Sequence, residues 1–151
     1  MVSQRGFSLI ELMIVLALLG FLLMLAVPFT NTWSANAKLR DAENLLQQGV
    51  GRVKALAQRN ALGISGSEKV AARLCLDRAT AKLELYPADT CSGTTAWSAQ
   101  LPTVVSIKND GTLFSCLAMS NRGLPVVTGN CNIKSEYTLS TGDENVKVTL
   151  H

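Results

Sequence analysis

The sequence contains little of what an enzyme active site needs. Its only histidine, His151, is the last residue, where we expect no third group to orient it. Serine, aspartate and glutamate residues are scattered without a catalytic motif, and no glycine-rich phosphate loop is present. The sequence therefore predicts a protein that is not an enzyme, with no cofactor and no small-molecule substrate.

Strong charge and metal-binding motifs are missing as well. The net charge is only +3 over 151 residues, whereas nucleic-acid binding usually needs a larger basic excess gathered on one face. No two cysteines have the Cys-x-x-Cys spacing and none has a histidine nearby, which argues against a zinc site and against thioredoxin-like chemistry. We therefore expect no metal.

The chain does contain one long apolar run. From Phe7 to Phe29 the side chains are apolar or small except for Ser8 and Glu11. About 23 residues of helix cover roughly 35 Å, which is enough to cross a bilayer. A carboxylate inside such a helix costs at least ~2.5 kcal/mol and is rare unless it is paired or functional. Glu11 therefore needs an explanation.

Two common kinds of N-terminal segment do not explain this carboxylate. A cleaved signal peptide has an apolar region of about 7–15 residues followed by a cleavage site, and this run is longer. A signal anchor fits the length, and Arg5 favours a cytoplasmic N-terminus under the positive-inside rule. The anchor interpretation stays open, but it gives Glu11 no role.

The residues at the start of the run provide a third interpretation, because they read Gly6-Phe7-Ser8-Leu9-Ile10-Glu11. This stretch resembles the type III signal of type IV prepilins and type II secretion pseudopilins. The resemblance implies that a prepilin peptidase in the membrane removes the leader, residues 1–6, by cutting between Gly6 and Phe7. It also implies N-methylation of Phe7.

The resemblance gives Glu11 a partner as well. After cleavage the α-amine of Phe7 is a cation four residues before Glu11, so both groups project from the same helix face. In the family, the glutamate of one subunit is thought to neutralise the N-terminal amine of a neighbour during filament assembly. Because an unpaired charge is expensive in hydrocarbon, such an assembly charge pair of Glu11 and Phe7 would set the register between subunits.

A second helical segment follows the apolar run. We divide the helix into a transmembrane and assembly segment, residues 7–30, and an amphipathic segment, residues 31–62, which should stop near Asn60 to Gly63. Trp33 suits the membrane interface. Gly20 and Pro28 are weak points at which the helix is predicted to kink; Pro28 either permits extension of a filament or forms a passive kink.

Residues 63–151 should form a β-rich head. Alternating patterns predict strands at 70–76, 81–86, 103–108, 112–119, 137–139 and 146–150, with a hairpin turn at 109–111 and a second turn within 140–145. We expect six or seven antiparallel strands, with the amphipathic helix packed on them. The predicted fold class is therefore α+β: a long N-terminal helix on an antiparallel β-sheet head, as in pilins.

The head contains four cysteines, Cys75, Cys91, Cys116 and Cys131. The even number and a periplasmic head favour disulfides. Of the three possible connectivities we favour Cys75–Cys91 with Cys116–Cys131, because each closes a loop of about 15 residues and restricts the unfolded chain by ~3 kcal/mol. Free buried thiols in one or both pairs remain the alternative.

Further segments of the head are similar to the GspH/FimT group of minor pilins and pseudopilins: residues 96–97, 101–102, 104–107 and 118–125, the last including Arg122-Gly123 in a turn. This resemblance, together with the cysteine pairs, favours a minor pilin of FimU type that helps to initiate or cap a type IV pilus. A type II secretion pseudopilin of GspH type is the alternative. Both imply the bacterial inner membrane, a cytoplasmic N-terminus, a periplasmic head, and other pilins or pseudopilins as partners.

Nucleic acid is a further candidate partner, because some FimT-type minor pilins bind DNA in natural transformation. Five basic residues are candidate DNA contacts: Arg52, Lys54, Arg59, Arg73 and Arg78. The DNA-binding members carry a Gly-Arg-x-Arg motif near the C-terminus, however, and this chain ends without it. We therefore rank DNA binding below the structural role.

Overall fold

A computed structural model describes residues 8–131 and 135–150, with the backbone alone at residues 26–29. Gly6, Phe7 and His151 lie outside the described residues. The secondary structure consists of one helix and a set of strands, with these bounds: α1 (Leu9–Arg59), β1 (Val70–Asp77), β2 (Lys82–Tyr86), β3 (Trp97–Gln100), β4 (Ser106–Asn109), β5 (Thr112–Leu113), β6 (Cys116–Ser120), β7 (Glu136–Thr141) and β8 (Glu144–Thr149).

The chain divides into two compact parts, residues 1–34 and 35–151. In the first part, the described side chains of α1 up to Trp33 are exposed. The second part, which we call the head, contains the remainder of α1 and all the described strands. This arrangement of one long N-terminal helix with antiparallel sheets confirms the predicted α+β, pilin-like fold.

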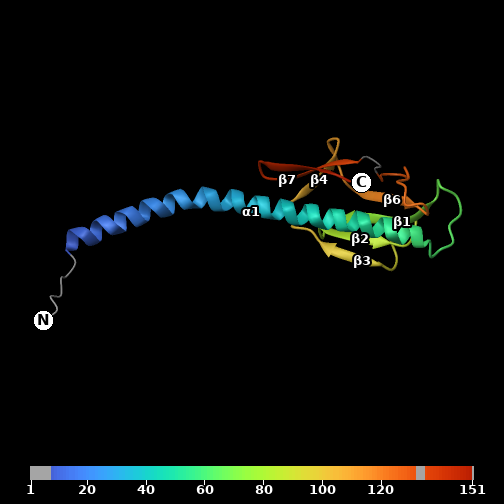
Figure 1. Ribbon diagram of the computed structural model, residues 1–151, viewed down its shortest axis with the longest axis horizontal. Helices are drawn as coiled ribbons and strands as arrows, with labels where there is room; N and C mark the ends of the chain where they lie inside the picture. Colours follow the sequence, from blue (N-terminus) through green and yellow to red (C-terminus); the bar gives the residue numbers. More distant parts are fainter. Residues whose placement is uncertain (1–7, 132–134, 151) are drawn as a thin grey trace. The chain divides into compact units, whose positions relative to one another are not determined.

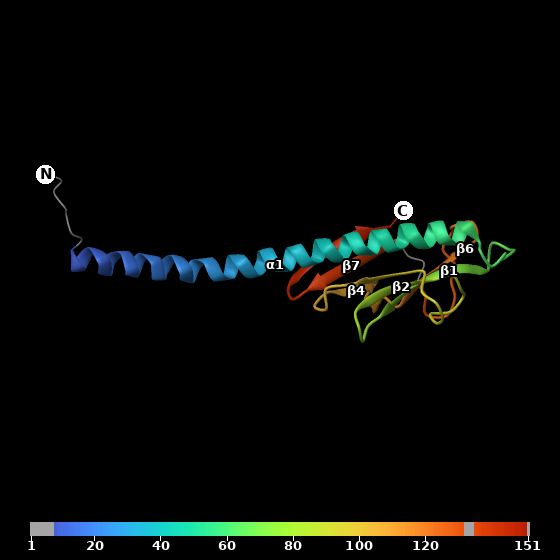
Figure 2. The same ribbon diagram turned by 90° about the horizontal axis from the view of Figure 1, so that it is seen from below.

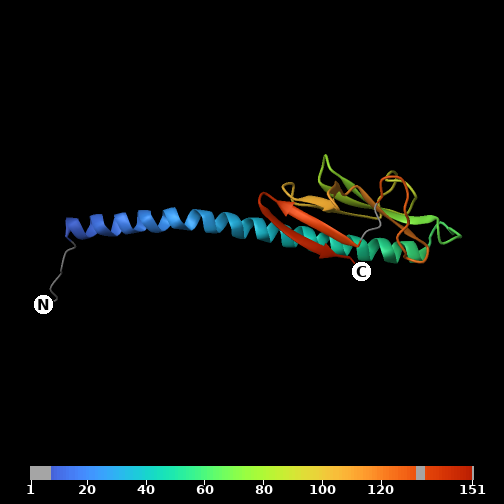
Figure 3. The same cartoon turned by 90° about the horizontal axis from the view of Figure 1, so that it is seen from above.

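The head contains two four-stranded antiparallel sheets. The first has the strand order β3-β2-β1-β6 and the second has the order β5-β4-β7-β8. Figure 3 shows the hairpin of β7 and β8 beside the other strands. The expectation of six or seven strands was too low, since eight occur in the described residues; Trp97–Gln100 forms a strand that the sequence patterns did not indicate.

The predicted single strand over residues 112–119 is also wrong, because its backbone changes partners midway. Phe114 N–H donates to Ile107 O of β4 at 2.9 Å, and one residue later Ser115 O accepts from Leu76 N–H of β1 at 2.8 Å. Cys116 then lies opposite Cys75 in the first sheet. The segment therefore divides into β5 and β6, and it joins the two sheets.

The turn at residues 109–111 has the predicted hairpin form. Asn109 lies opposite Thr112, which leaves Asp110 and Gly111 as a two-residue loop, and both have positive φ, of 49° and 80°. Two positive φ values are what a tight hairpin needs to match the twist of its strands. In the second predicted hairpin β7 and β8 extend further than expected, and only Gly142 and Asp143 separate them.

One stripe of α1 packs on the two sheets, as Figures 1 and 2 show for its second half. The stripe recurs at three- and four-residue steps, so its members lie on one helix face. They are buried together with core residues of both sheets such as Leu74, Leu83, Ile107 and Tyr137. The buried stripe consists of Leu39, Ala42, Leu46, Val50, Val53 and Ala57.

The helix ends where the sequence indicated a C-terminal signal. Arg59 is its last residue, and Asn60 adopts a left-handed φ of 47°, the backbone form that commonly terminates a helix. The Asn60 side chain accepts from Ile64 N–H at 2.7 Å and donates to Ile64 O at 2.9 Å. These two bonds fix the direction in which the chain leaves α1 toward β1.

Gly49 and Gly51 provide a matched test of this packing. A Cβ on Gly49 would lie 3.0 Å from Leu74 Cδ2 and 3.5 Å from the Trp97 ring, whereas a Cβ on Gly51 meets nothing within 4 Å. We expect Gly49→Val to lower the free energy of unfolding by ~1–3 kcal/mol through overpacking, and Gly51→Val to leave it nearly unchanged. Because Trp33 and Trp97 are the only two tryptophans, urea unfolding is best followed by fluorescence in a Trp33→Phe background. Equal stability of the two valine variants would contradict the packing.

Candidate functional site

The described part of the N-terminal segment begins just after the predicted cleavage site. Ser8 precedes α1, its carbonyl accepts from Leu12 N–H at 3.1 Å, and Glu11 lies in the first helical turn. The Glu11 side chain is exposed. Because Phe7 lies outside the described residues, cleavage at Gly6, methylation of Phe7 and the Glu11–Phe7 pair remain predictions.

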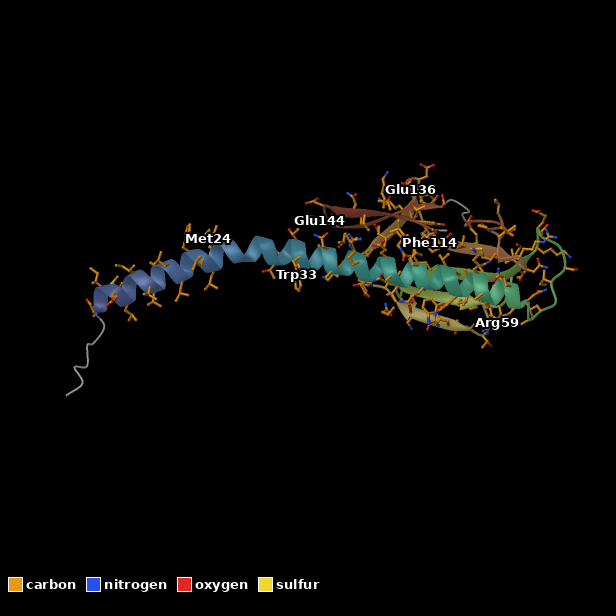
Figure 4. All side chains as sticks on the ribbon, in the orientation of Figure 1. Met24, Trp33, Arg59, Phe114, Glu136 and Glu144 are labelled. Atoms are coloured by element: carbon orange, nitrogen blue, oxygen red, sulfur yellow. A yellow bond between two sulfur atoms is a disulfide. The ribbon has the colours of Figure 1, made fainter. Side chains whose placement is uncertain are left out.

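The apolar segment of α1 makes no contact that buries it. The 18 consecutive residues with the highest mean hydropathy have a value of 2.8, and they are 0% buried. Figure 4 shows Met24 and Trp33 projecting from this part of the helix, and they are 78% and 70% exposed. By length and composition the segment is able to cross a membrane. Lipid or neighbouring helices would remove this apolar surface from water.

Gly20 and Pro28 both lie inside continuous helix. The helical backbone runs from Leu9 to Arg59 without a break, and a Cβ on Gly20 would meet nothing within 4 Å. Proline lacks the N–H that an interior helical position donates, so the turn before Pro28 is missing one hydrogen bond. The kink at these two residues remains a prediction.

Two disulfides lie on the face of the first sheet that points away from α1. Cys75 is bonded to Cys91 and Cys116 to Cys131, with Cα–Cα distances of 5.9 and 4.5 Å. These are the pairs that the loop lengths favoured. Cys75 and Cys116 are also cross-strand neighbours on β1 and β6, so the two bridges lie side by side in a small cluster with Tyr86.

Three ionisable groups of the head have shifted pKa values. The Thr80 hydroxyl and Ala79 N–H donate to the Asp77 carboxylate at 2.6 and 2.9 Å and hold its pKa below the usual value. The hydroxyl of Tyr86 donates to Glu84 at 2.6 Å, which raises the pKa of Tyr86. Burial raises the pKa of Tyr137. Asp77 thereby organises the turn from β1 to β2.

The five basic residues considered for DNA binding lie on different parts of the head. Arg52 and Arg59 are seven positions apart on α1 and share a face, whereas Lys54 lies on nearly the opposite side. The Arg52 guanidinium stacks on the Trp97 ring at 5.0 Å from its centroid, and Lys54 lies beside Gly123. Arg73 lines a hollow with the disulfides on the outer sheet face, and Arg78 follows β1. The structure therefore does not align the five in one stripe.

The turn at Arg122-Gly123 lies directly against α1. Gly123 has a φ of 72°, and its N–H donates to Ser120 O at 2.8 Å. A Cβ on Gly123 would lie 2.9 Å from the Gln58 amide nitrogen and 3.0 Å from Lys54 Cγ. The positive φ therefore favours glycine, and any larger residue would also displace the Gln58 and Lys54 side chains. Within the described residues, no group of three or more His, Cys, Asp or Glu side chains is placed to hold a metal ion.

A long N-terminal helix with an apolar start, packed further along on antiparallel sheets, is a pilin-like architecture. The sequence model of the prokaryotic N-terminal methylation motif matches residues 1–27. Motif and fold together support a type IV pilin-like or pseudopilin protein, a structural subunit. No curated protein and no solved structure matches the chain.

The disulfides provide a test of how the head is stabilised. Replacing Cys75 and Cys91 by alanine, or Cys116 and Cys131 by alanine, should lower the free energy of unfolding by about 3 kcal/mol in each case, because each bridge closes a loop of similar length. Urea unfolding of the oxidised chain measures this loss. Mapping of the unreduced protein should recover the two bridges separately, and a Cys75–Cys116 link would contradict the structure.

Proposed function

We propose that this chain is a minor pilin that inserts in the bacterial inner membrane, is processed by prepilin peptidase, and helps to initiate or cap a type IV pilus. The observation that carries the proposal is the methylation motif at residues 1–27 on a helix whose apolar segment is entirely unburied. An apolar segment of this length is unfavourable in water. In a filament subunit, the membrane would surround it before assembly and neighbouring helices would surround it afterwards.

The proposed orientation agrees with the chemistry of the head. Arg5 before the apolar segment favours a cytoplasmic N-terminus, and with that orientation residues 35–151 would lie in the periplasm. That compartment is oxidising and permits the two disulfides. The proposed path is therefore single-pass insertion, oxidation of the head, removal of residues 1–6 on the cytoplasmic side, and transfer into a filament.

Glu11 is the proposed assembly residue. It is the only charged side chain between Phe7 and Phe29, and it lies in the first turn of α1. In hydrocarbon its carboxylate gains most from a cation, and the α-amine of a processed neighbour provides one. Assembly is thereby coupled to processing, because that amine exists only after the leader is cut.

Replacement of Glu11 tests this pairing. Glu11→Ala should still be processed and inserted, yet it should be incorporated into filaments at least about tenfold less well, the loss expected when roughly 1.4 kcal/mol of pairing is removed. Incorporation is measured by immunoblotting of sheared filaments against the membrane fraction. Leu12→Ala is the matched control, since it truncates an adjacent exposed side chain without changing charge. Normal incorporation of Glu11→Ala would refute the pairing.

Processing is tested separately at Gly6. Intact-mass measurement of the purified chain should show a protein that begins at Phe7 and carries one added methyl group. Gly6→Leu should leave the leader attached in the membrane, because the resemblance places the cut directly after this glycine. A chain that keeps Met1 would show that the apolar segment is used as an anchor only, and a mature N-terminus at any other residue would refute cleavage after Gly6.

A type II secretion pseudopilin shares the motif and the helix, so variants at Gly6 and Glu11 do not distinguish the two machines, whereas deletion of the chain does. If the chain is a minor pilin, deletion should reduce the number of surface pili and leave protein secretion intact. Loss of secretion with normal piliation would assign the chain to the secretion system instead.

A further inference from the structure

The four half-cystines of the head differ in their exposure to solvent. Cys75, Cys116 and Cys131 are 5%, 6% and 2% exposed and belong to one buried cluster on the outer face of the first sheet. Cys91 is exposed, as is every residue around it from 89 to 96. Thiol–disulfide exchange depends on access to the sulfur that is attacked, so Cys91 is the sulfur that an incoming thiol reaches most readily.

A hollow of about 440 Å³ lies beside the Cys75–Cys91 bridge. Cys75, Cys91 and Cys116 all line it. Its other lining residues are mostly polar or charged, among them Arg73 and Ser115. A polar space of this volume has room for several water molecules or for a thiol of a few heavy atoms. The hollow therefore gives a small thiol a place beside both bridges.

The loop that carries Cys91 has little besides its disulfide to hold it. In the part of the chain that the structure describes, residues 87–95 make one hydrogen bond, between the Thr90 and Ser92 hydroxyls of the loop itself. Ala88 packs on the cysteine cluster. Few hydrogen bonds and high exposure mark a segment that opens at low cost. The bond to Cys75 is therefore the main attachment of this loop to the sheet.

The loop that carries Cys131 is held by contacts that do not depend on its disulfide. Asn130 O accepts from Ser115 Oγ at 2.7 Å. The backbones of Cys131 and Cys116 also form an isolated β-bridge. These contacts keep the Cys131 sulfur close to Cys116 when the S–S bond between them opens. Three of the four sulfurs are thus held in one place by the sheet and by this loop.

Cys75 and Cys116 are placed to bond to each other as well. They lie opposite one another on β1 and β6, and beyond them Leu76 N–H donates to Ser115 O at 2.8 Å. Leu76 and Ser115 therefore form a hydrogen-bonded pair, and Cys75 and Cys116 form the non-hydrogen-bonded pair beside it. In such a pair the Cα atoms are about 4.5 Å apart, within the range of roughly 4.4–6.8 Å that disulfides use. A Cys75–Cys116 bond needs no movement of the backbone.

We propose that Cys91 is the entry site of the head for a thiol of low molecular weight, and that the other three half-cystines form an exchange relay behind it. The external thiolate attacks the Cys91 sulfur, forms a mixed disulfide and releases Cys75 as a thiolate. The Cys75 thiolate then attacks the Cys116 sulfur, so the Cys75–Cys116 bond forms and the Cys116–Cys131 bond breaks. Cys131 leaves as a thiolate and takes up the proton that the external thiol lost. One thiol enters and one is released, so the sequence needs no further oxidant or reductant.

The relay would free the loop at residues 87–96 while β1 and β6 stay cross-linked. Without an added thiol the two native bridges remain, because no thiolate is present to start the exchange. The proposal depends on the head alone and is independent of the proposed role in a filament.

The relay is tested on the full chain in detergent with Cys91→Ala, which leaves Cys75 without its loop partner. The oxidised variant is equilibrated at about pH 8, near the usual pKa of a thiol, and free thiols are then alkylated and mapped by mass spectrometry. We expect label on both Cys75 and Cys131, with at least about one tenth of it on Cys131, because both bridges to Cys116 close without backbone movement. Label on Cys75 alone would overturn the relay, and label on Cys116 would contradict its cross-strand geometry.

Cys75→Ala is the matched control. It also leaves one thiol, but on Cys91, which does not lie opposite Cys116 in the sheet. We expect nearly all of the label on Cys91, with the Cys116–Cys131 bridge retained. Equal scrambling of the bridges in the two variants would show that exchange follows loss of structure, and it would overturn the relay.

Entry at Cys91 is tested on the unchanged oxidised chain. The chain is mixed with a limiting amount of β-mercaptoethanol, quenched with acid and mapped for the mixed disulfide. We expect the adduct on Cys91 at least about tenfold more often than on any other cysteine, because the other three are buried. Adducts spread evenly, or found first on Cys131, would overturn the entry site even if the chain is incorporated into filaments as proposed.

Discussion

The burial of one stripe of α1 is the interaction on which the head depends. Leu46 and Val53 are completely buried, and they meet side chains from both sheets, so the helix forms the shared wall of the core. The two four-stranded sheets are joined at Phe114 and Ser115, where the backbone changes partners from β4 to β1. The close approach of Gly49 to Leu74 and Trp97 brings the helix near enough to close the core. Each buried apolar side chain of this size contributes about 1.5–3 kcal/mol, so the helix is indispensable to the head.

The outer face of the first sheet is stabilised differently, because no helix covers it. Cys75 and Cys116 lie opposite one another and each bridges to a loop, which holds residues 87–96 and 121–131 against the sheet. Covalent links take the place of a second layer in a head whose β part has fewer than about 100 residues, a size at which core burial alone is marginal. The second of these loops also covers the free edge of β6, through residues 124–131. Oxidation of the head therefore stabilises the sheet and closes one of its edges.

Sequence reasoning predicted the features that depend on local periodicity and failed where long-range pairing decides. The amphipathic helix within residues 31–62 and the hairpin turn at residues 109–111 follow from spacing and from backbone preference, and both were predicted. Strand β3 was missed because four residues with one aromatic give no period-two signal, and it is a strand only because β2 lies beside it. Residues 112–113 pair with the neighbouring β4, but the start of β6 depends on β1, more than 30 residues earlier in the chain, which local pattern does not encode. Among the candidate site residues, those at residues 6 and 7 remain predictions from the motif alone.

One helix serves two environments because its residues change along its length. Between Leu9 and Leu25 every described face is apolar apart from Glu11, which suits lipid or other helices on all sides. From Lys38 onward the apolar residues withdraw to one stripe, and charged side chains such as Arg40 and Glu43, which are paired at 3.0 Å, occupy other faces. The contacts that fold the head therefore come from a part of α1 that is separate from its apolar segment. In the proposed function, that apolar segment is the part that meets the membrane or neighbouring helices.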